Sequence, residues 1–114
     1  MHELSVTESL LEIALRHAHA AQAKRINTLY LVIGNLSSIV DDSIQFYWDI
    51  MTKGTLAEGA QLIFQRIPTE MICLDCHHRY TPEKEDMACQ SCGSIHVKII
   101  AGEEFQLEAL DIET

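Results

Sequence analysis

Two short segments decide how this chain folds: Cys73-Leu74-Asp75-Cys76 and Cys89-Gln90-Ser91-Cys92. They contain all four cysteines of the chain, arranged as two C-x2-C pairs with twelve residues between them. Two intervening residues let both sulfurs of a pair turn toward one ion, and four thiolates complete a tetrahedral zinc shell. We therefore predict a structural zinc site formed by Cys73, Cys76, Cys89 and Cys92. Because four thiolates leave no open position, this zinc is not expected to be catalytic.

Other uses of the cysteines explain less of the pattern. Cys76-His77 completes the C-x-x-C-H attachment signal of haem c, but the second cysteine pair would then have no role. A single C-x-x-C pair is also typical of a redox dithiol. An enzyme such as a thiol oxidoreductase would need reactive cysteines that hold no zinc, so metal analysis separates the two interpretations.

The charge balance disfavours nucleic acid as a partner. The 114 residues include 8 Lys and Arg against 17 Asp and Glu, a net charge of -9 that four zinc-bound thiolates make more negative. A chain of this charge repels phosphate backbones and suits a cationic ligand or a basic protein better. No apolar run is long enough to span a membrane, and the N-terminus lacks the pattern of a secretory signal. We expect a cytoplasmic protein, and a reducing compartment favours metal over disulfides.

The rest of the sequence predicts an alternation of helices and strands. A helix is expected over residues 4–21 and a buried strand over 28–33, ended by Gly34. A second helix should begin near Asp41 and stop at Gly54, followed by a strand over 61–67. A last strand is expected over 104–112. In the first helix, Leu4, Leu11, Leu15 and Ala18 form an apolar stripe, with Leu10, Ala14 and Ala21 beside it. Both helices carry capping-box spacings, at Ser5/Glu8 and at Asp42/Gln45.

These elements predict an α+β fold, with two helices on a small three-stranded sheet and an inserted zinc-ribbon-like lobe. The α+β domain would comprise residues 1–68 with 101–114, and the zinc-binding domain residues 69–100. The insert has too few apolar residues beyond its cysteines to fold unaided, so we expect metal-binding energy to order it.

The histidines differ in what their positions allow. His17 and His19 fall at the end of the first helix, where an imidazolium complements the helix dipole. His77, His78 and His96 lie near the cysteines and are solvated loop residues, groups that act beside the zinc, or ligands that exchange with one of the cysteines. His2 is different, because the α-amine of Met1, the backbone amide and the imidazole can form fused chelate rings. Such rings suit nickel or copper, and Glu3 could add an oxygen. A frayed terminus with an incidental histidine is the plain alternative.

Several of these motifs occur together, in one order, in a known family. They are Met1-His2-Glu3-Leu4-Ser5, Gly34-Asn35-Leu36-Ser37, the run Gly54-Thr55-Leu56-Ala57-Glu58-Gly59-Ala60, the two C-x2-C pairs and Cys92-Gly93-Ser94. The chain resembles HypA-type hydrogenase maturation factors, the nickel metallochaperones for [NiFe]-hydrogenase, over nearly its whole length.

The resemblance implies a nickel-binding α+β domain beside a zinc domain, and transfer of metal without turnover, so we expect a non-enzyme. By resemblance, nickel is bound by His2 with the Met1 α-amine, Glu3 takes part in coordination or transfer, and the four cysteines bind zinc. Asp41 and Asp42 both stand where some members place an aspartate near the nickel, and neither is assigned. The implied partners are the nickel GTPase HypB and the large-subunit precursor of the hydrogenase, and some members also serve urease. The rival hypothesis is a zinc-stabilised adaptor that transfers no nickel.

Overall fold

The chain divides into two compact units in a computed structural model that describes residues 3–83 and 86–114. The helical unit comprises Met1–Val32, Ser38–Gln65 and Gln106–Thr114. The cysteine unit comprises Ile33–Ser37 and Arg66–Phe105 and contains both C-x2-C pairs.

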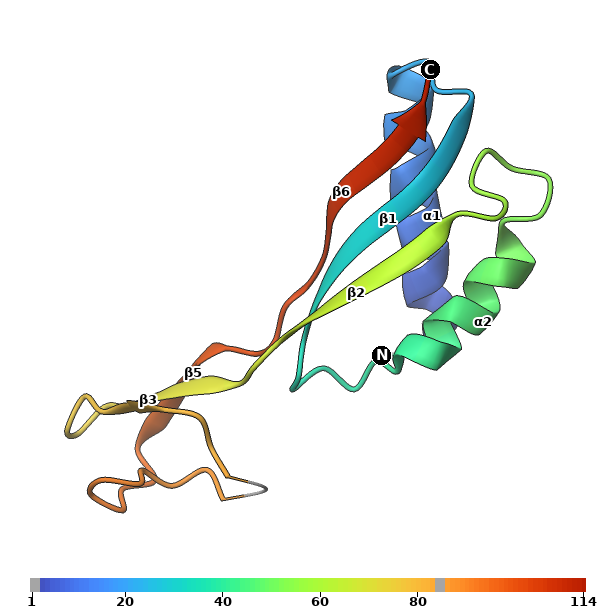
Figure 1. The fold of residues 1–114 in the computed structure, drawn as a ribbon. Coiled ribbons are helices and arrows are strands. Elements are labelled where there is room, and N and C mark those ends of the chain that lie inside the picture. The colour runs from blue at the N-terminus through green and yellow to red at the C-terminus, as the bar shows by residue number, and fades with distance from the viewer. Residues whose placement is uncertain (1–2, 84–85) are drawn as a thin grey trace. The chain divides into compact units, whose positions relative to one another are not determined.

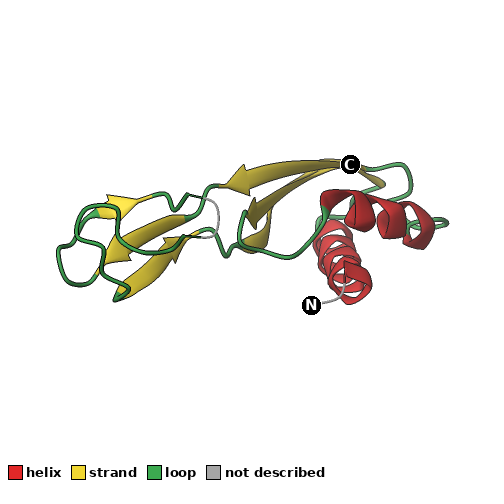
Figure 2. Cartoon of the chain, turned by 90° about the horizontal axis from the view of Figure 1, so that it is seen from below, coloured by secondary structure: helices red, strands yellow, loops and turns green. Residues whose placement is uncertain are grey.

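The helical unit has two helices on one face of a three-stranded sheet (Figures 1 and 2). The helices are α1 (Glu3–Ala20) and α2 (Asp41–Met51), and the strands are β1 (Arg25–Gly34), β2 (Gln61–Ile67) and β6 (Phe105–Glu113). The strand order is β2-β1-β6, and α1 packs against α2. The predicted α+β class, with two helices on a small three-stranded sheet, is confirmed.

The central strand β1 carries most of the buried surface of the sheet. It starts three residues earlier than predicted, at Arg25, because Ile26 is also drawn into the core. The Lys24 N–H donates to the Glu113 carbonyl at one end of β1, and the Gly34 N–H donates to Glu104 at the other, so β6 runs antiparallel to β1. Leu29 and Leu31 lie in the same core as Trp48 of α2, and all three are essentially inaccessible to solvent.

The buried face of α1 differs from the predicted stripe. The helix buries Val6, Thr7, Leu10, Ala14 and Ala18. Leu4, which was expected inside, is 43% exposed. Thr7 is fully buried because its hydroxyl donates to the Glu3 carbonyl at 2.6 Å, so no polar group is left unpaired there.

Both predicted capping boxes are wrong. Since α1 already begins at Glu3, Ser5 lies inside its first turn. The N-cap of α2 is Val40, in extended conformation (φ -102°, ψ 123°) and without a side-chain cap bond. The acidic side chains of Asp41 and Asp42 still occupy the first turn, where they complement the positive end of the helix dipole.

The cysteine unit has a sheet of its own, which the sequence analysis did not predict. Its strands are β3 (Glu70–Cys73), β4 (Arg79–Tyr80) and β5 (Val97–Ala101), antiparallel and in the order β4-β3-β5. The unit also has a small core, in which cysteines of the two pairs take part. Its core comprises Met71, Cys73, Tyr80 and Cys89, with Met87, Val97 and Ile99 packed against it. Two of these core side chains are themselves cysteines of the pairs, and strands this short leave too little alternation to recognise.

Two glycines approach each other closely: Gly34, the last residue of β1, and Gly102, the residue after β5. A Cβ atom on Gly34 would come within 1.9 Å of the Gly102 carbonyl oxygen. The Leu36 N–H donates to the same oxygen at 2.8 Å, and the Asn35 N–H donates to the Ile67 carbonyl at 2.9 Å. Gly34 therefore ends β1 as predicted, and the physical reason is the absence of a side chain at a backbone crossing.

Candidate metal centre

The two cysteine pairs adopt the same backbone turn. The His77 N–H donates to the Cys73 carbonyl and the Gly93 N–H donates to the Cys89 carbonyl, both at 2.8 Å. One residue further on, the carbonyl of His78 accepts from the Cys73 N–H at 2.9 Å. The carbonyl of Ser94 likewise accepts from the Cys89 N–H, at 2.8 Å. We call these two turns, Cys73–His78 and Cys89–Ser94, the first and second knuckle.

The knuckles bring the four sulfurs into one cluster. The ligand atoms of Cys73, Cys76, Cys89 and Cys92 all lie within 4.8 Å of one another. Cys73 Sγ lies 3.6 Å from Cys92 Sγ, and Cys76 Sγ lies 3.6 Å from Cys89 Sγ. Tetrahedral zinc with bonds of about 2.3 Å places its sulfurs about 3.8 Å apart, so the cluster fits zinc. Cys73 and Cys89 are buried while Cys76 and Cys92 are exposed, and all four are free of disulfides.

Backbone N–H groups and neighbouring sulfurs shift the pKa values of Cys89 and Cys92 in opposite directions. The Cys92 N–H, 3.5 Å from Cys89 Sγ, together with the Ser91 N–H at 3.4 Å, lowers the pKa of Cys89 to about 6 against the effect of burial. A backbone N–H of Ser94 favours the thiolate of Cys92, but the sulfur of Cys73 and burial outweigh it and raise the pKa of Cys92 to about 12. Sulfurs this close cannot all ionise alone, so a divalent cation is what completes the cluster.

The fifth residue of each knuckle has a left-handed backbone conformation, but the residue type differs between the two knuckles. Gly93 has φ 76°, a conformation that glycine adopts without steric cost. His77 has φ 64° at the equivalent place, where a β-carbon makes the same conformation costly. The first knuckle therefore carries strain that the second does not.

The three histidines near the cysteines are not part of the sulfur cluster. The ring of His78 stacks on that of Tyr80, with centroids 5.9 Å apart. His96 Nδ1 lies 3.2 Å from Asp75 Oδ1. In residues 3–83 and 86–114, the four cysteines are the one group of three or more Cys, His, Asp or Glu whose ligand atoms are close enough to share an ion.

The contacts of Asp75 and Ser94 were missed by the sequence analysis. Ser94 Oγ donates to Asp75 Oδ2, and this bond, followed by the contact with His96, lowers the pKa of the Asp75 carboxyl. No periodicity or spacing in the sequence indicates this pairing, since the two residues are brought together only when both knuckles have formed.

Two of the three predicted nickel-binding residues, Met1 and His2, lie outside the described residues. Glu3 is the first residue of α1 and is half-buried. Asp41 and Asp42 open α2, with Asp42 exposed and Asp41 half-buried. The predicted roles of Met1, His2 and Glu3 in nickel binding therefore stay predictions, and neither aspartate is assigned to the metal.

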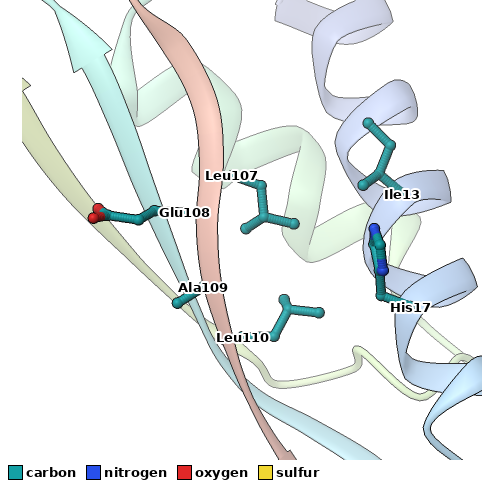
Figure 3. A pocket seen from close by; sticks show the side chains of 6 residues that line it. All are labelled: Ile13, His17, Leu107, Glu108, Ala109 and Leu110. Carbon is teal, nitrogen blue, oxygen red and sulfur yellow. The ribbon is translucent and has the colours of Figure 1, made fainter.

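A separate hollow of about 400 Å³ lies between α1 and β6 in the helical unit. Its lining residues are Ile13, His17, Leu107, Glu108, Ala109 and Leu110. Figure 3 shows Leu107 and Leu110 directed toward the helix, whereas Glu108 points away from it. Most of its lining side chains are apolar, and among the residues that the structure describes none of them belongs to a group of metal ligands.

The described helices also bear on membrane association. Neither is both long and apolar enough to cross a membrane.

Fold and site together define a class: a small α+β protein with a separate unit whose four cysteines fit a zinc ion. The family model described as "Hydrogenase/urease nickel incorporation, metallochaperone, hypA" matches residues 1–112. The chain belongs to this family, as the resemblance predicted.

Relatives and solved structures agree with this assignment. The chain is 38% identical over 113 residues to the hydrogenase maturation factor HypA of Dehalococcoides mccartyi, covering 99% of this chain and 95% of the relative. It is 35% identical over 114 residues to HypA of Caldanaerobacter subterraneus, covering 99% of this chain and all of the relative. The solution structure of the Ni metallochaperone HypA from Helicobacter pylori matches with a TM-score of 0.68 and 29% identity, covering 99% of this chain and 98% of that one.

Proposed function

We propose that this chain binds Ni(II) at its N-terminus and delivers it for maturation of [NiFe]-hydrogenase, while a zinc ion in the four-cysteine cluster has a structural role. The observation that carries the proposal is the family match over residues 1–112, to a model described by nickel incorporation. The sulfur spacing of 3.6 Å supports the zinc part, because it fits a closed tetrahedral shell.

The proposed nickel ligands are the Met1 α-amine and backbone and ring nitrogens at His2, with Glu3 as an additional oxygen donor. Amine, amide nitrogen and imidazole nitrogen on one short segment form fused chelate rings, which suit the tetragonal or square-planar geometry of Ni(II). Protonation of the amide nitrogen, or replacement of one donor, releases the metal. A terminal chelate of this kind is suited to transfer.

The proposal assigns nickel to residues 1–68 with 101–114 and zinc to residues 69–100. It makes the chain a cytoplasmic carrier, not an enzyme, that works with a nickel GTPase of the HypB type and docks on the hydrogenase large-subunit precursor. Neither nucleic acid nor a membrane is a proposed partner, in keeping with the net charge of -9.

The test is a nickel titration of the zinc-loaded protein beginning at Met1, compared with variants. His2→Ala and an uncleaved extension before Met1 should each weaken nickel binding at least about tenfold, because each removes a donor of the fused rings. His19→Ala, which alters an exposed histidine of α1, and a histidine-free C-terminal extension are the matched controls. Glu3→Gln should affect transfer more than affinity, since its oxygen is a peripheral donor.

The competing function, a zinc-stabilised adaptor without nickel transfer, predicts that none of these changes at the N-terminus affects nickel binding. If the extended protein binds nickel as tightly as the native one, the terminal chelate is wrong. Zinc content should remain one ion per chain in all of these variants, because the cysteines lie in the other unit.

A further inference from the structure

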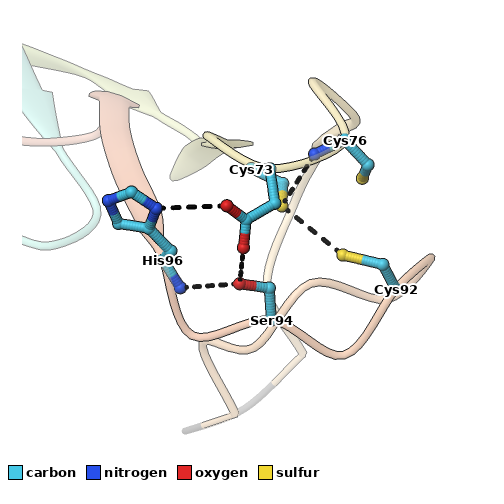
Figure 4. Close-up of polar contacts among 6 residues, drawn as sticks. Cys73, Cys76, Cys92, Ser94 and His96 are labelled. Carbon is cyan, nitrogen blue, oxygen red and sulfur yellow. Dashed lines mark hydrogen bonds and ion pairs between the residues drawn. The ribbon is translucent and has the colours of Figure 1, made fainter.

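Three polar side chains link the two knuckles outside the sulfur cluster (Figure 4). Asp75 lies inside the first knuckle, between its two cysteines, whereas Ser94 and His96 lie at and just after the end of the second. Ser94 Oγ donates to one carboxylate oxygen of Asp75, and His96 Nδ1 lies 3.2 Å from the other. The His96 N–H in turn donates to Ser94 Oγ at 3.0 Å, which closes a ring of hydrogen bonds.

This ring adds side-chain bonds to the backbone bonds at the end of the second knuckle. Gly93 separates Cys92 from Ser94 and has φ 76°, so the exit of the second knuckle is conformationally permissive. Backbone bonds hold the chain on both sides of this point, from the Cys89 N–H to the Ser94 carbonyl and from the Leu74 N–H to the His96 carbonyl, both 2.8 Å long. The side chains of Asp75 and Ser94 fix the intervening turn against the first knuckle.

The same contacts determine where the His96 ring lies. His96 Nδ1 faces a carboxylate oxygen of Asp75, and the dashed line drawn from the His96 ring in Figure 4 marks this contact. Only three residues separate His96 from Cys92, and its side chain is 68% exposed, so the contact with Asp75 holds in place an imidazole that could otherwise approach zinc. Histidine nitrogen is a good zinc ligand.

We propose that Asp75, Ser94 and His96 form a clamp that holds the two knuckles in register, slows the release of zinc and keeps the His96 imidazole out of the metal shell. The three are positioning residues, because they act on the cysteines and do not touch the ion. Groups that orient metal ligands commonly change metal affinity by about 10–100-fold when removed. The proposal rests on the zinc site of the proposed function and is independent of its nickel site.

The first test measures zinc transfer from the holo protein to excess of a chromogenic chelator. Asp75→Ala and Ser94→Ala should each speed release about tenfold. The double variant should be no faster than the faster single one, because both substitutions open the same ring. Asp75→Asn, which keeps one acceptor, should fall between Asp75→Ala and the unmodified chain.

Two controls separate the clamp from general effects on the unit. Gln90→Ala removes an exposed bond from the second knuckle to the Thr81 carbonyl, 3.0 Å long, which does not reach the first knuckle. Glu103→Gln removes one exposed negative charge elsewhere in the cysteine unit. Both should release zinc at the unmodified rate. Release from Ser94→Ala within twofold of that rate, or equal acceleration by Gln90→Ala, overturns the proposal.

A zinc-edge X-ray absorption measurement provides a readout that a purely structural role would not change. The unmodified chain should have four sulfur neighbours, and Asp75→Ala should show some nitrogen in place of sulfur. Adding His96→Ala to Asp75→Ala should restore the all-sulfur shell. An all-sulfur shell in Asp75→Ala alone overturns the role assigned to His96. A chain that purifies without zinc refutes both the clamp and the zinc site, and leaves the nickel titration to decide the rest.

Discussion

The two units of this chain are stabilised by different means. In the helical unit, bulky apolar side chains such as Leu29, Ile44 and Trp48 are fully removed from water. In the cysteine unit the core cluster is four residues, of which Cys73 and Cys89 belong to the metal cluster. Burial of apolar surface stabilises a fold by roughly 25 cal/mol per Å², and most of the buried apolar side chains belong to the first unit. The second needs the binding energy of an ion.

The difference explains how one short chain can combine a stable scaffold with a metal-dependent module. It also predicts that perturbations remain local: loss of metal should leave the helical unit folded, and a core defect in the helices should leave the sulfur cluster intact. The following experiments perturb one unit or the other.

Removal of zinc should have the largest effect. Structural zinc contributes apparent binding energies of about 10–16 kcal/mol in small domains, more than the cysteine unit can replace by burial. We expect chelation, Cys73→Ala or Cys92→Ala to abolish the dispersed NMR signals of residues 66–105, while the helical circular dichroism at 222 nm is largely retained. A metal-free chain with four free thiols and a fully dispersed spectrum would contradict the comparison.

Truncation of the helical core should have the next largest effect. Trp48→Ala should lower the free energy of unfolding of the helical unit by about 3–5 kcal/mol, because it leaves a large cavity. Urea unfolding of the zinc-loaded protein, followed by the helical signal, measures this change. Phe46→Ala, in the same helix but 61% exposed, is the control and should change stability by less than about 0.5 kcal/mol.

Trp48→Phe should be much milder than Trp48→Ala. The indole N–H of Trp48 is buried without a hydrogen-bond acceptor among the residues that the structure describes. An unpaired buried donor costs about 1–3 kcal/mol, so removing it offsets part of the packing that is lost. Zinc content should be unchanged in both Trp48 variants, and a loss of zinc in Trp48→Ala would show that the two units are not independent.

How far the sequence determined these features depends on the kind of interaction. The zinc cluster was predictable because C-x2-C spacing is a local geometric requirement, and the buried strand around Leu29 because its apolar run is continuous. The sheet of the cysteine unit was not predictable, since β4 is only Arg79–Tyr80 and pairs with β3 through tertiary contacts. The buried face of α1 was misjudged because Thr7, a polar residue, is buried by a hydrogen bond that periodicity does not reveal.

The glycine crossing at the end of β1 provides the third test. Gly34→Ala should destabilise the chain at the upper end of about 1–3 kcal/mol, because its Cβ would lie 1.9 Å from the Gly102 carbonyl oxygen and the backbone must shift. Gly54→Ala is the matched control: φ is +80° there, yet no atom lies within 4 Å of the added carbon. Its cost should be limited to about 1–2 kcal/mol of backbone strain. Equal melting temperatures for the two variants would rule out the close approach as the cause.

The smallest expected effect concerns the fifth residue of each knuckle. The backbone conformation there is the same in both, but the residue is His77 in the first knuckle and Gly93 in the second. His77→Gly should relieve about 1–2 kcal/mol of left-handed strain, since φ is 64° in the first knuckle. Glycine also loses more conformational entropy on folding, about 0.4–1 kcal/mol, so the net stabilisation should be less than about 1 kcal/mol. The measurement is urea unfolding of the full chain with Co(II) in place of zinc, followed by the absorbance of the Co(II) site. Gly93→Ala is the reciprocal change and should destabilise the second knuckle, where φ is 76°. If His77→Gly instead destabilised the unit as much as Gly93→Ala, the His77 ring would have a stabilising contact that outweighs its strain, and the two knuckles would not be equivalent supports of the metal.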